Sequence, residues 1–503
     1  MLLLTDGTVM CKSGSGGASY GNQWNKLTPD SKGSYVNGTW TTLSPMNDTR
    51  LYFASQVLKD GRVFVAGGEY GTGGAKGETY NSLTDTWTEA PAPGSTISDA
   101  NSLLMPDGRV LVALVTGNLK TTTIFDPVAN TWTAGPTCNG IHNESVWVQV
   151  PDGSTLFVDR LTTNSERYIP SLNQWIVDGT VPVALYDGYG DEAGPGFLLP
   201  NGQAFFIGSP SNTAYYTPSG STSPGHWSTG PTIPNAQGAP DAPGAMMANG
   251  KILCVLSPTP TSSNHFPSPS TFYEFDYTTN TFTAILGPNG ASTTSMSTYV
   301  ANMLDLPDGS VLYCEQGYSQ YYVYNSGGTP LAAGQPTVTS ISPNGDGSYH
   351  LVGTQLNGIS QGAIYGDDWQ MSTNYPIVRL TSECLLLPHL QLEQRGCTDR
   401  QHSGDHGVHP ARIAPPGRLL TPGGGQWHCV GFDSICDLLF QSRGRHTGRH
   451  GDPDGSGLHG KHGGELQWRE CQLHGELRHA DHDHGAGGSH DRLHHRGCPR
   501  GHD

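Results

Sequence analysis

Positive charge is scarce over the first three quarters of this chain. Residues 1–383 contain 13 Lys and Arg against 29 Asp and Glu, which gives this part a net charge of −16 out of −17 for the whole chain. Such a surface disfavours nucleic acid and anionic membranes, and it favours cationic or neutral partners. Long hydrophobic runs are also missing, since no stretch approaches the 18 apolar residues of a membrane span.

Cysteine is equally sparse in this part. The four cysteines there lie far apart in the sequence, at Cys11, Cys138, Cys254 and Cys314. They offer no disulfide framework and do not identify the redox compartment. The few lysines and the many Gly, Ser, Thr and Asn residues are typical of a secreted β protein.

A short apolar run, an Asp-Gly or Asn-Gly pair and a second β-branched run occur seven times, at intervals of 45 to 59 residues. Asp-Gly and Asn-Gly between such runs predict β-hairpins, and we expect type I′ turns with positive φ at both central residues. A hairpin that recurs about every fifty residues predicts a β-propeller. The seven pairs begin at Asp6, Asp60, Asp107, Asp152, Asn201, Asn249 and Asp308.

A second repeated signal follows most of these hairpins. It is an aromatic or polar run that ends in a large ring, at Trp40, Trp87, Trp132, Trp175, Trp227 and Phe282. A ring of this size buries about 150–250 Å². We therefore expect these residues to pack between neighbouring blades and not to form a binding site.

These repeats resemble kelch repeats, and more closely the propeller of the galactose oxidase and glyoxal oxidase family. The resemblance rests on residues 50–91 (LYFASQVLKDGRVFVAGG followed by YNSLTDTWTEAP), with the glycine pair Gly67-Gly68, and on residues 299–312 (YVANMLDLPDGSVL). It covers roughly residues 1–383. The fold it implies is all-β: a seven-bladed kelch-type propeller, then a partial immunoglobulin-like sandwich, in an extracellular or cell-envelope protein.

The domain boundaries follow from changes in composition. We assign residues 1–335 to the propeller with an incomplete first blade, and 336–383, where four strands are expected, to the partial immunoglobulin-like domain. Residues 384–503 hold 17 of the 21 His and none of the 21 Tyr, and this abrupt change resembles translation out of frame. We predict a disordered His-, Arg- and Gly-rich tail there, although a natural metal-binding tail is an alternative.

Both ends of the propeller suggest truncation. Met1 starts directly on an apolar strand with no signal segment before it, so we expect the start codon to lie inside the natural gene. The last unit has no Trp strand after residues 321–325, and its outer strand is expected to be absent.

The loops that enter the innermost strands of a propeller meet at one mouth of the central channel. Eight or nine residues before each turn after the first, the chain places two tyrosines and four carboxylates, with a fifth carboxylate, Asp191, beside one of them: Tyr52, Asp99, Glu144, Glu192, Asp241 and Tyr299. One hypothesis is an acidic, aromatic mouth that binds a carbohydrate or small molecule, with a protein partner left open. The alternative is that these residues only cap loop backbone groups. His142, next to this register, is expected to be an ordinary loop residue.

The family resemblance implies a copper-radical oxidase of alcohols or aldehydes, which we keep as an alternative function. Tyr52 and Tyr299 stand at the positions of the family's copper-binding tyrosines. Val300 and Gln370 stand where the family has histidines, and the crosslinked cysteine would precede Met1. Because Cu(II) prefers imidazole ligands, we expect no metal and no cofactor. A third hypothesis is a glycoside hydrolase or lyase that uses two of the mouth carboxylates.

Overall fold

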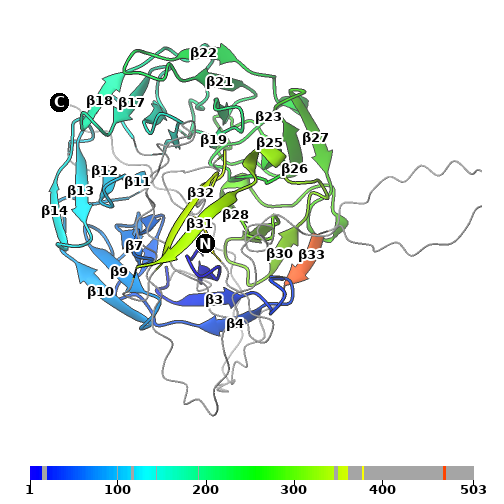
Figure 1. The fold of residues 1–503 in the computed structure, drawn as a ribbon. Coiled ribbons are helices and arrows are strands. Elements are labelled where there is room, and N and C mark those ends of the chain that lie inside the picture. The colour runs from blue at the N-terminus through cyan, green and yellow to red at the C-terminus, as the bar shows by residue number, and fades with distance from the viewer. Residues whose placement is uncertain are drawn as a thin grey trace, which may run out of the picture.

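A computed structural model describes residues 1–13, 20–98, 100–114, 118–142, 144–190, 192–344, 349–360, 376–378 and 468–471. Seven antiparallel sheets are arranged around a common centre, with the N-terminus near that centre (Figure 1). The predicted all-β, seven-bladed propeller is therefore confirmed. Among the described residues, no helix is long and apolar enough to cross a membrane.

Each sheet is one blade, and its strands run from the channel outward in chain order. Blade 1 consists of β1 (Leu2–Leu3), β2 (Val9–Lys12), β3 (Trp24–Thr28) and β4 (Thr39–Thr42). Blade 2 consists of β6 (Ala54–Val57), β7 (Val63–Ala66), β9 (Gly77–Asn81) and β10 (Thr86–Ala90). Blade 3 consists of β11 (Ser102–Leu104), β12 (Val110–Ala113), β13 (Thr122–Asp126) and β14 (Thr131–Ala134). The first blade thus has four strands, where we expected an incomplete one.

Blades 4 and 5 repeat this order without interruption. Blade 4 consists of β15 (Trp147–Gln149), β16 (Thr155–Val158), β17 (Ser165–Ile169) and β18 (Gln174–Val177). Blade 5 consists of β19 (Gly196–Leu198), β20 (Ala204–Ile207), β21 (Thr213–Thr217) and β22 (His226–Thr229).

Blades 6 and 7 depart from the simple order. Blade 6 has five strands, because both β23 (Gln237–Gly238) and β24 (Gly244–Met246) pair with β25 (Ile252–Pro258), which is followed by β26 (Thr271–Asp276) and β27 (Thr281–Ile285). Blade 7 consists of β28 (Ala301–Asp305), β29 (Val311–Glu315), β30 (Tyr321–Tyr324) and β33 (Trp468–Cys471). The outer strand that was expected to be absent from the last blade is therefore present as β33, which comes from the segment 384–503 and pairs with β30 along its whole length.

Smaller elements connect or flank the blades. Two further hairpins pair β5 (Arg50–Leu51) with β8 (Tyr70–Gly71), and β31 (Thr337–Pro343) with β32 (Tyr349–Thr354). Single 3₁₀ turns are η1 (Pro234–Ala236), η2 (Pro288–Gly290), η3 (Thr298–Val300) and η4 (Ala332–Gly334). The β31–β32 hairpin belongs to the predicted immunoglobulin-like domain, and most of residues 361–383 and of the predicted tail lie outside the described residues.

The seven Asp-Gly and Asn-Gly pairs all form inner hairpins, but the predicted type I′ geometry is wrong. Only the glycines have positive φ, between 80° and 92°. In the first turn, Gly7 donates its N–H to the Leu4 carbonyl at 2.9 Å, so Asp6 is the third residue of the turn. The geometry is a type I turn followed by a left-handed glycine, which explains why Pro106, Pro151, Pro200 and Pro307 occupy the second turn position in four blades.

The repeated outer rings pack between blades as predicted. Trp132 lies 5.8 Å from Phe64 of the preceding blade, and the Trp227 indole donates to Ser165 Oγ of blade 4 at 3.0 Å. Trp40 of blade 1 lies 4.6 Å from Tyr321 of blade 7. A buried cluster that contains Leu2 to Leu4 together with Leu304 and Val323 therefore closes the ring between its first and last blades.

The carboxyl group of Asp305 lies at the end of β28, where burial raises its pKa to about 7 against an opposing hydrogen bond from the Met246 backbone. The folded pKa is above the unfolded value of 3.8, so ionisation of the unfolded chain destabilises the protein as the pH rises from about 4 to 7. We expect the free energy of unfolding of Asp305→Asn, relative to that of the unmodified protein, to be about 1–3 kcal/mol higher at pH 8 than at pH 4. This range is reduced for solvent screening, because the side chain is only half-buried. Urea unfolding at both pH values measures this gain, and an equal difference at the two would contradict it.

Candidate functional site

The predicted site residues lie where the chain enters the innermost strands. Because every blade has the same strand direction, these entries are at one end of the channel. Asp99 and Asp191 lie outside the described residues. The other five precede β6, β15, β19 and β24 or lie in η3 before β28: Tyr52, Glu144, Glu192, Asp241 and Tyr299.

Glu192, Asp241 and Tyr299 come together across blades 5, 6 and 7. The Asp241 N–H donates to the carbonyl of Ala193, the neighbour of Glu192, at 3.0 Å. Burial raises the pKa of Tyr299, and the negative charge of Asp241 raises it further. Glu192 and Asp241 are both buried. Together they form an acidic arc along one part of the mouth.

Tyr52 joins this arc from blade 2. Its hydroxyl donates to Gln316 Oε1 at 3.3 Å, and the Gln316 N–H donates to the carbonyl of Val300, next to Tyr299, at 2.7 Å. Tyr52 and Gln316 are 264 residues apart in the chain. The two tyrosines that the sequence singled out are therefore connected through the backbone and side chain of Gln316.

An aromatic wall, which the sequence analysis missed, stands beside Tyr52. Tyr70 lies edge-on to Tyr52 with ring centroids 6.1 Å apart, and Tyr20 is stacked on Tyr70 at 5.1 Å. Tyr70 is 37% exposed. Its position directly after Gly67-Gly68-Glu69 was the available signal, because a strand that ends in a glycine pair delivers the next residues to this end of the blade.

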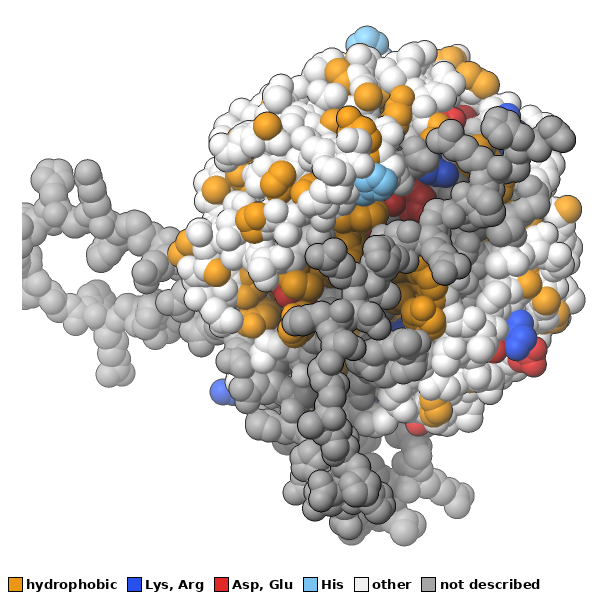
Figure 2. Space-filling model, turned by 180° about the vertical axis from the view of Figure 1, so that it is seen from behind, with side chains coloured by type: hydrophobic (Ala, Val, Ile, Leu, Met, Phe, Trp, Pro, Cys, Tyr) orange, Lys and Arg blue, Asp and Glu red, His pale blue; other side chains and the backbone are white. Residues whose placement is uncertain are grey.

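The loop before Glu192 is shaped by Asp187, which the sequence analysis also missed. Asp187 Oδ1 accepts from the backbone N–H groups of Tyr189 and Gly190 at 2.7 and 2.6 Å. This places Tyr189 near His265, with ring centroids 6.5 Å apart. Figure 2 shows acidic side chains and a histidine side by side near the middle of one face of the ring.

A cavity of about 270 Å³ lies next to Gln316, between blades 6 and 7. Its lining includes the carboxylate of Glu315 and the rings of Tyr318 and Tyr322. Glu315 Oε1 accepts from the hydroxyls of Thr294 and Tyr313, both at 2.9 Å. The volume is near the lower end of the range of small-molecule sites, which begins at about 300 Å³.

Three mouth residues have a backbone conformation that side chains rarely adopt. The φ angles of Tyr52, Glu144 and Asp241 are 52°, 52° and 47°. The left-handed region is unusual for residues other than Gly, Asn and Asp, and it persists only where the surroundings enforce it. The loops at the mouth are therefore held in place by other contacts.

His142 supplies such contacts near Glu144. It is completely buried, stacks on Phe157 at 3.5 Å, donates from Nε2 to Glu166 at 2.9 Å and accepts at Nδ1 from the Trp147 indole at 2.9 Å. Burial lowers the pKa of His142 despite the neighbouring Glu166 carboxylate. The imidazole is thus a neutral member of a buried hydrogen-bond network, whereas the sequence analysis expected an ordinary loop residue.

Among the described residues, Cys138, His142 and Glu166 form a group that could hold a metal ion, since their ligand atoms lie within 4.8 Å of one another. Both His142 nitrogens already take part in hydrogen bonds, and Glu166 also accepts from the backbone of Asn139 and Gly140. Burial raises the pKa of Cys138 to about 12, so the thiol stays protonated. This network needs no metal to satisfy its polar atoms.

The neighbours of the two mouth tyrosines bear on the copper-oxidase alternative. Their neighbours include Gln316 and Tyr70 for Tyr52, and Phe266 and Asp241 for Tyr299. This set contains phenols, an amide and a carboxylate, whereas Cu(II) prefers imidazole. Gln370 lies outside the described residues, so the loss of the second histidine stays a prediction, and we derive no step through copper.

The seven four- or five-stranded antiparallel sheets define the protein as a seven-bladed β-propeller. A fungal alcohol oxidase of the AA5 family, solved in complex with copper, has a similar structure: the TM-score is 0.52 at 16% identity, over 76% of this chain and 87% of that one. The structure of YjhT matches with a TM-score of 0.38 at 16% identity, over 55% of this chain and 94% of that one. No family model and no curated protein match the sequence.

Proposed function

We propose that this propeller binds carbohydrate at its mouth, as an extracellular protein. The observation that carries the proposal is the combination of the aromatic wall of Tyr20, Tyr52 and Tyr70 with the acidic arc of Glu192 and Asp241. Aromatic faces pack against the apolar faces of sugar rings, and carboxylates accept hydrogen bonds from hydroxyl groups. The net charge of −16 over residues 1–383 favours a neutral ligand of this kind over an anionic one.

The proposal is tested with a panel of galactose-, glucose- and N-acetylglucosamine-based oligosaccharides. We expect binding of at least one of them, and a loss of about tenfold in affinity in Tyr70→Ala and in Asp241→Asn. Asparagine keeps the shape of Asp241 and tolerates its positive φ, so this variant isolates the charge.

Glu89→Ala is the matched control, because Glu89 is an exposed acid on the outer strand β10. It should bind as the unmodified protein does. A panel without a binder, or binding that survives both mouth variants, would contradict the proposal. Release of reducing ends from the bound oligosaccharides would show that the protein hydrolyses them, as the glycoside hydrolase alternative predicts.

A further inference from the structure

Two buried glutamates hold the mouth loops of blades 2 and 4 in the same way. In blade 2, Glu78 Oε2 accepts from both the backbone N–H and the side-chain amide of Asn47, at 2.7 and 2.8 Å. In blade 4, Glu166 Oε2 accepts from the same two groups of Asn139, both at 2.9 Å. Each glutamate is the second residue of the third strand of its blade.

The next backbone N–H along each loop also donates to the same glutamate. Asp48 donates to Glu78 Oε1 at 3.1 Å, and Gly140 donates to Glu166 Oε1 at 2.8 Å. Each carboxylate therefore receives at least three donors from two consecutive loop residues. Hydrogen bonds to an ionised acceptor are roughly twice as strong as neutral ones, so this anchors the start of the loop firmly.

A basic side chain three residues after each asparagine completes the arrangement. Arg50 donates to Glu78 Oε1 at 3.0 Å, and His142 donates to Glu166 Oε1 at 2.9 Å. Arg50 and His142 are both completely buried, and so is Glu78. A buried carboxylate requires such partners, because without them its desolvation would be costly.

The loops then reach the mouth after the same number of residues. Tyr52 is five residues after Asn47, and Glu144 is five residues after Asn139. Both have a φ of 52°. Two loops with different sequences, NDTRLY and NGIHNE, therefore place their sixth residue in the same strained conformation.

We propose that Glu78 and Glu166 are positioning residues that set the backbone conformation, and hence the direction, of Tyr52 and Glu144 at the mouth. The effect on ligand binding rests on the proposed function, whereas the effect on the loops does not. Blade 5 uses a different contact, since the loop before Glu192 is shaped by Asp187 from within the loop itself.

The test is hydrogen–deuterium exchange of the full chain with Glu78→Gln and Glu166→Gln. Glutamine is nearly isosteric, but its amide turns one of the two acceptor oxygens into a donor that faces other donors. We expect at least tenfold faster exchange in residues 47–53 for the first variant and in 139–147 for the second, each without effect on the other loop.

Glu274→Gln is the matched control. Glu274 lies on β26, which pairs with β25 in blade 6 as β9 pairs with β7 in blade 2. It is also buried, but it pairs with Lys251 at 2.9 Å and with Tyr324 at 2.8 Å. It should leave both loops unchanged. Exchange in β25 and β26 serves as the internal reference for global destabilisation.

Asn47→Ala and Asn139→Ala are milder variants that keep the carboxylates and their basic partners. They should accelerate exchange in the same loops by about threefold, and they keep the test valid if a glutamine variant does not fold. Equal acceleration in all blades, or none in the loops, would overturn the proposal. If the loops respond as expected while no oligosaccharide of the panel binds, only the proposed function fails.

Discussion

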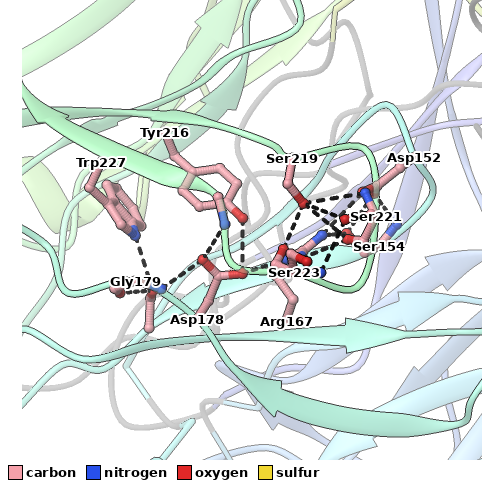
Figure 3. Close-up of polar contacts among 12 residues, drawn as sticks. Asp152, Ser154, Arg167, Asp178, Gly179, Tyr216, Ser219, Ser221, Ser223 and Trp227 are labelled. Carbon is pink, nitrogen blue, oxygen red and sulfur yellow. Dashed lines mark hydrogen bonds and ion pairs between the residues drawn. The ribbon is translucent and has the colours of Figure 1, made fainter.

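Replacing Arg167 by alanine is expected to destabilise the protein by about 3–5 kcal/mol. Arg167 is completely buried in blade 4, where Nε donates to Asp178 at 2.6 Å and Nη1 donates to Asp152 at 3.1 Å. Its Nη2 donates to the backbone carbonyls of Ser221 and Ser223 in blade 5, at 3.0 and 2.6 Å (Figure 3). Alanine would leave the buried Asp178 carboxylate without its main counter-charge and would disconnect the two blades.

Urea unfolding measures the loss, and Arg109→Ala is its control. Arg109 pairs with Asp107 at 2.7 Å, but it is 41% exposed, so its loss should cost less than about 1 kcal/mol. A double variant, Arg167→Met with Asp178→Leu, should be more stable than Arg167→Ala because it removes both buried charges. If Arg167→Ala costs no more than Arg109→Ala, the pair does not contribute as its burial implies.

The architecture was predictable because the propeller repeats local signals. The Asp-Gly and Asn-Gly pairs fix the inner hairpins, and the rings at Trp132 and Trp227 fix the packing between blades. The turn type was not predictable from the pair alone, because it depends on the residue before it, such as Pro106.

The contacts that shape the mouth are less visible in the sequence. Glu78 and Asn47 are 31 residues apart, and Glu166 and Asn139 are 27 apart, so no fixed spacing reveals them. Their basic partners are of different types, Arg50 and His142, although both donate a hydrogen bond to Oε1 of the glutamate. The register of the mouth residues follows from the hairpins, whereas their conformation is set by these long-range contacts.

Strand β33 shows a different limit of strand prediction from the sequence. Pairing between strands uses backbone N–H and C=O groups, which every residue except proline carries. The sequence around residues 468–471 shows no alternating β pattern, yet all four of these residues pair with β30. A sequence pattern therefore cannot exclude a segment from an open sheet edge.

The glycine pair of blade 2 gives the other prediction with a large effect: Gly67→Ala should destabilise the protein by about 3–5 kcal/mol. Gly67 has a φ of 77°, and a Cβ atom there would lie 1.9 Å from the carbonyl oxygen of Ile97. That carbonyl accepts the N–H of Gly68 at 2.8 Å, and Ile97 is completely buried. Neither the backbone of Ile97 nor that of Gly68 can move away without losing this hydrogen bond.

Gly74→Ala separates the clash from the backbone strain, because Gly74 also has a positive φ, 48°, but has no atom within 4 Å of the added Cβ. It should cost only about 1–2 kcal/mol, which is the penalty for a side chain in the left-handed region. Urea unfolding of both variants should give a difference of at least about 1 kcal/mol. If the two variants were equally stable, the segment around Ile97 could yield, and the second glycine of the pair, Gly68 with its φ of 130°, would be the one that this blade requires.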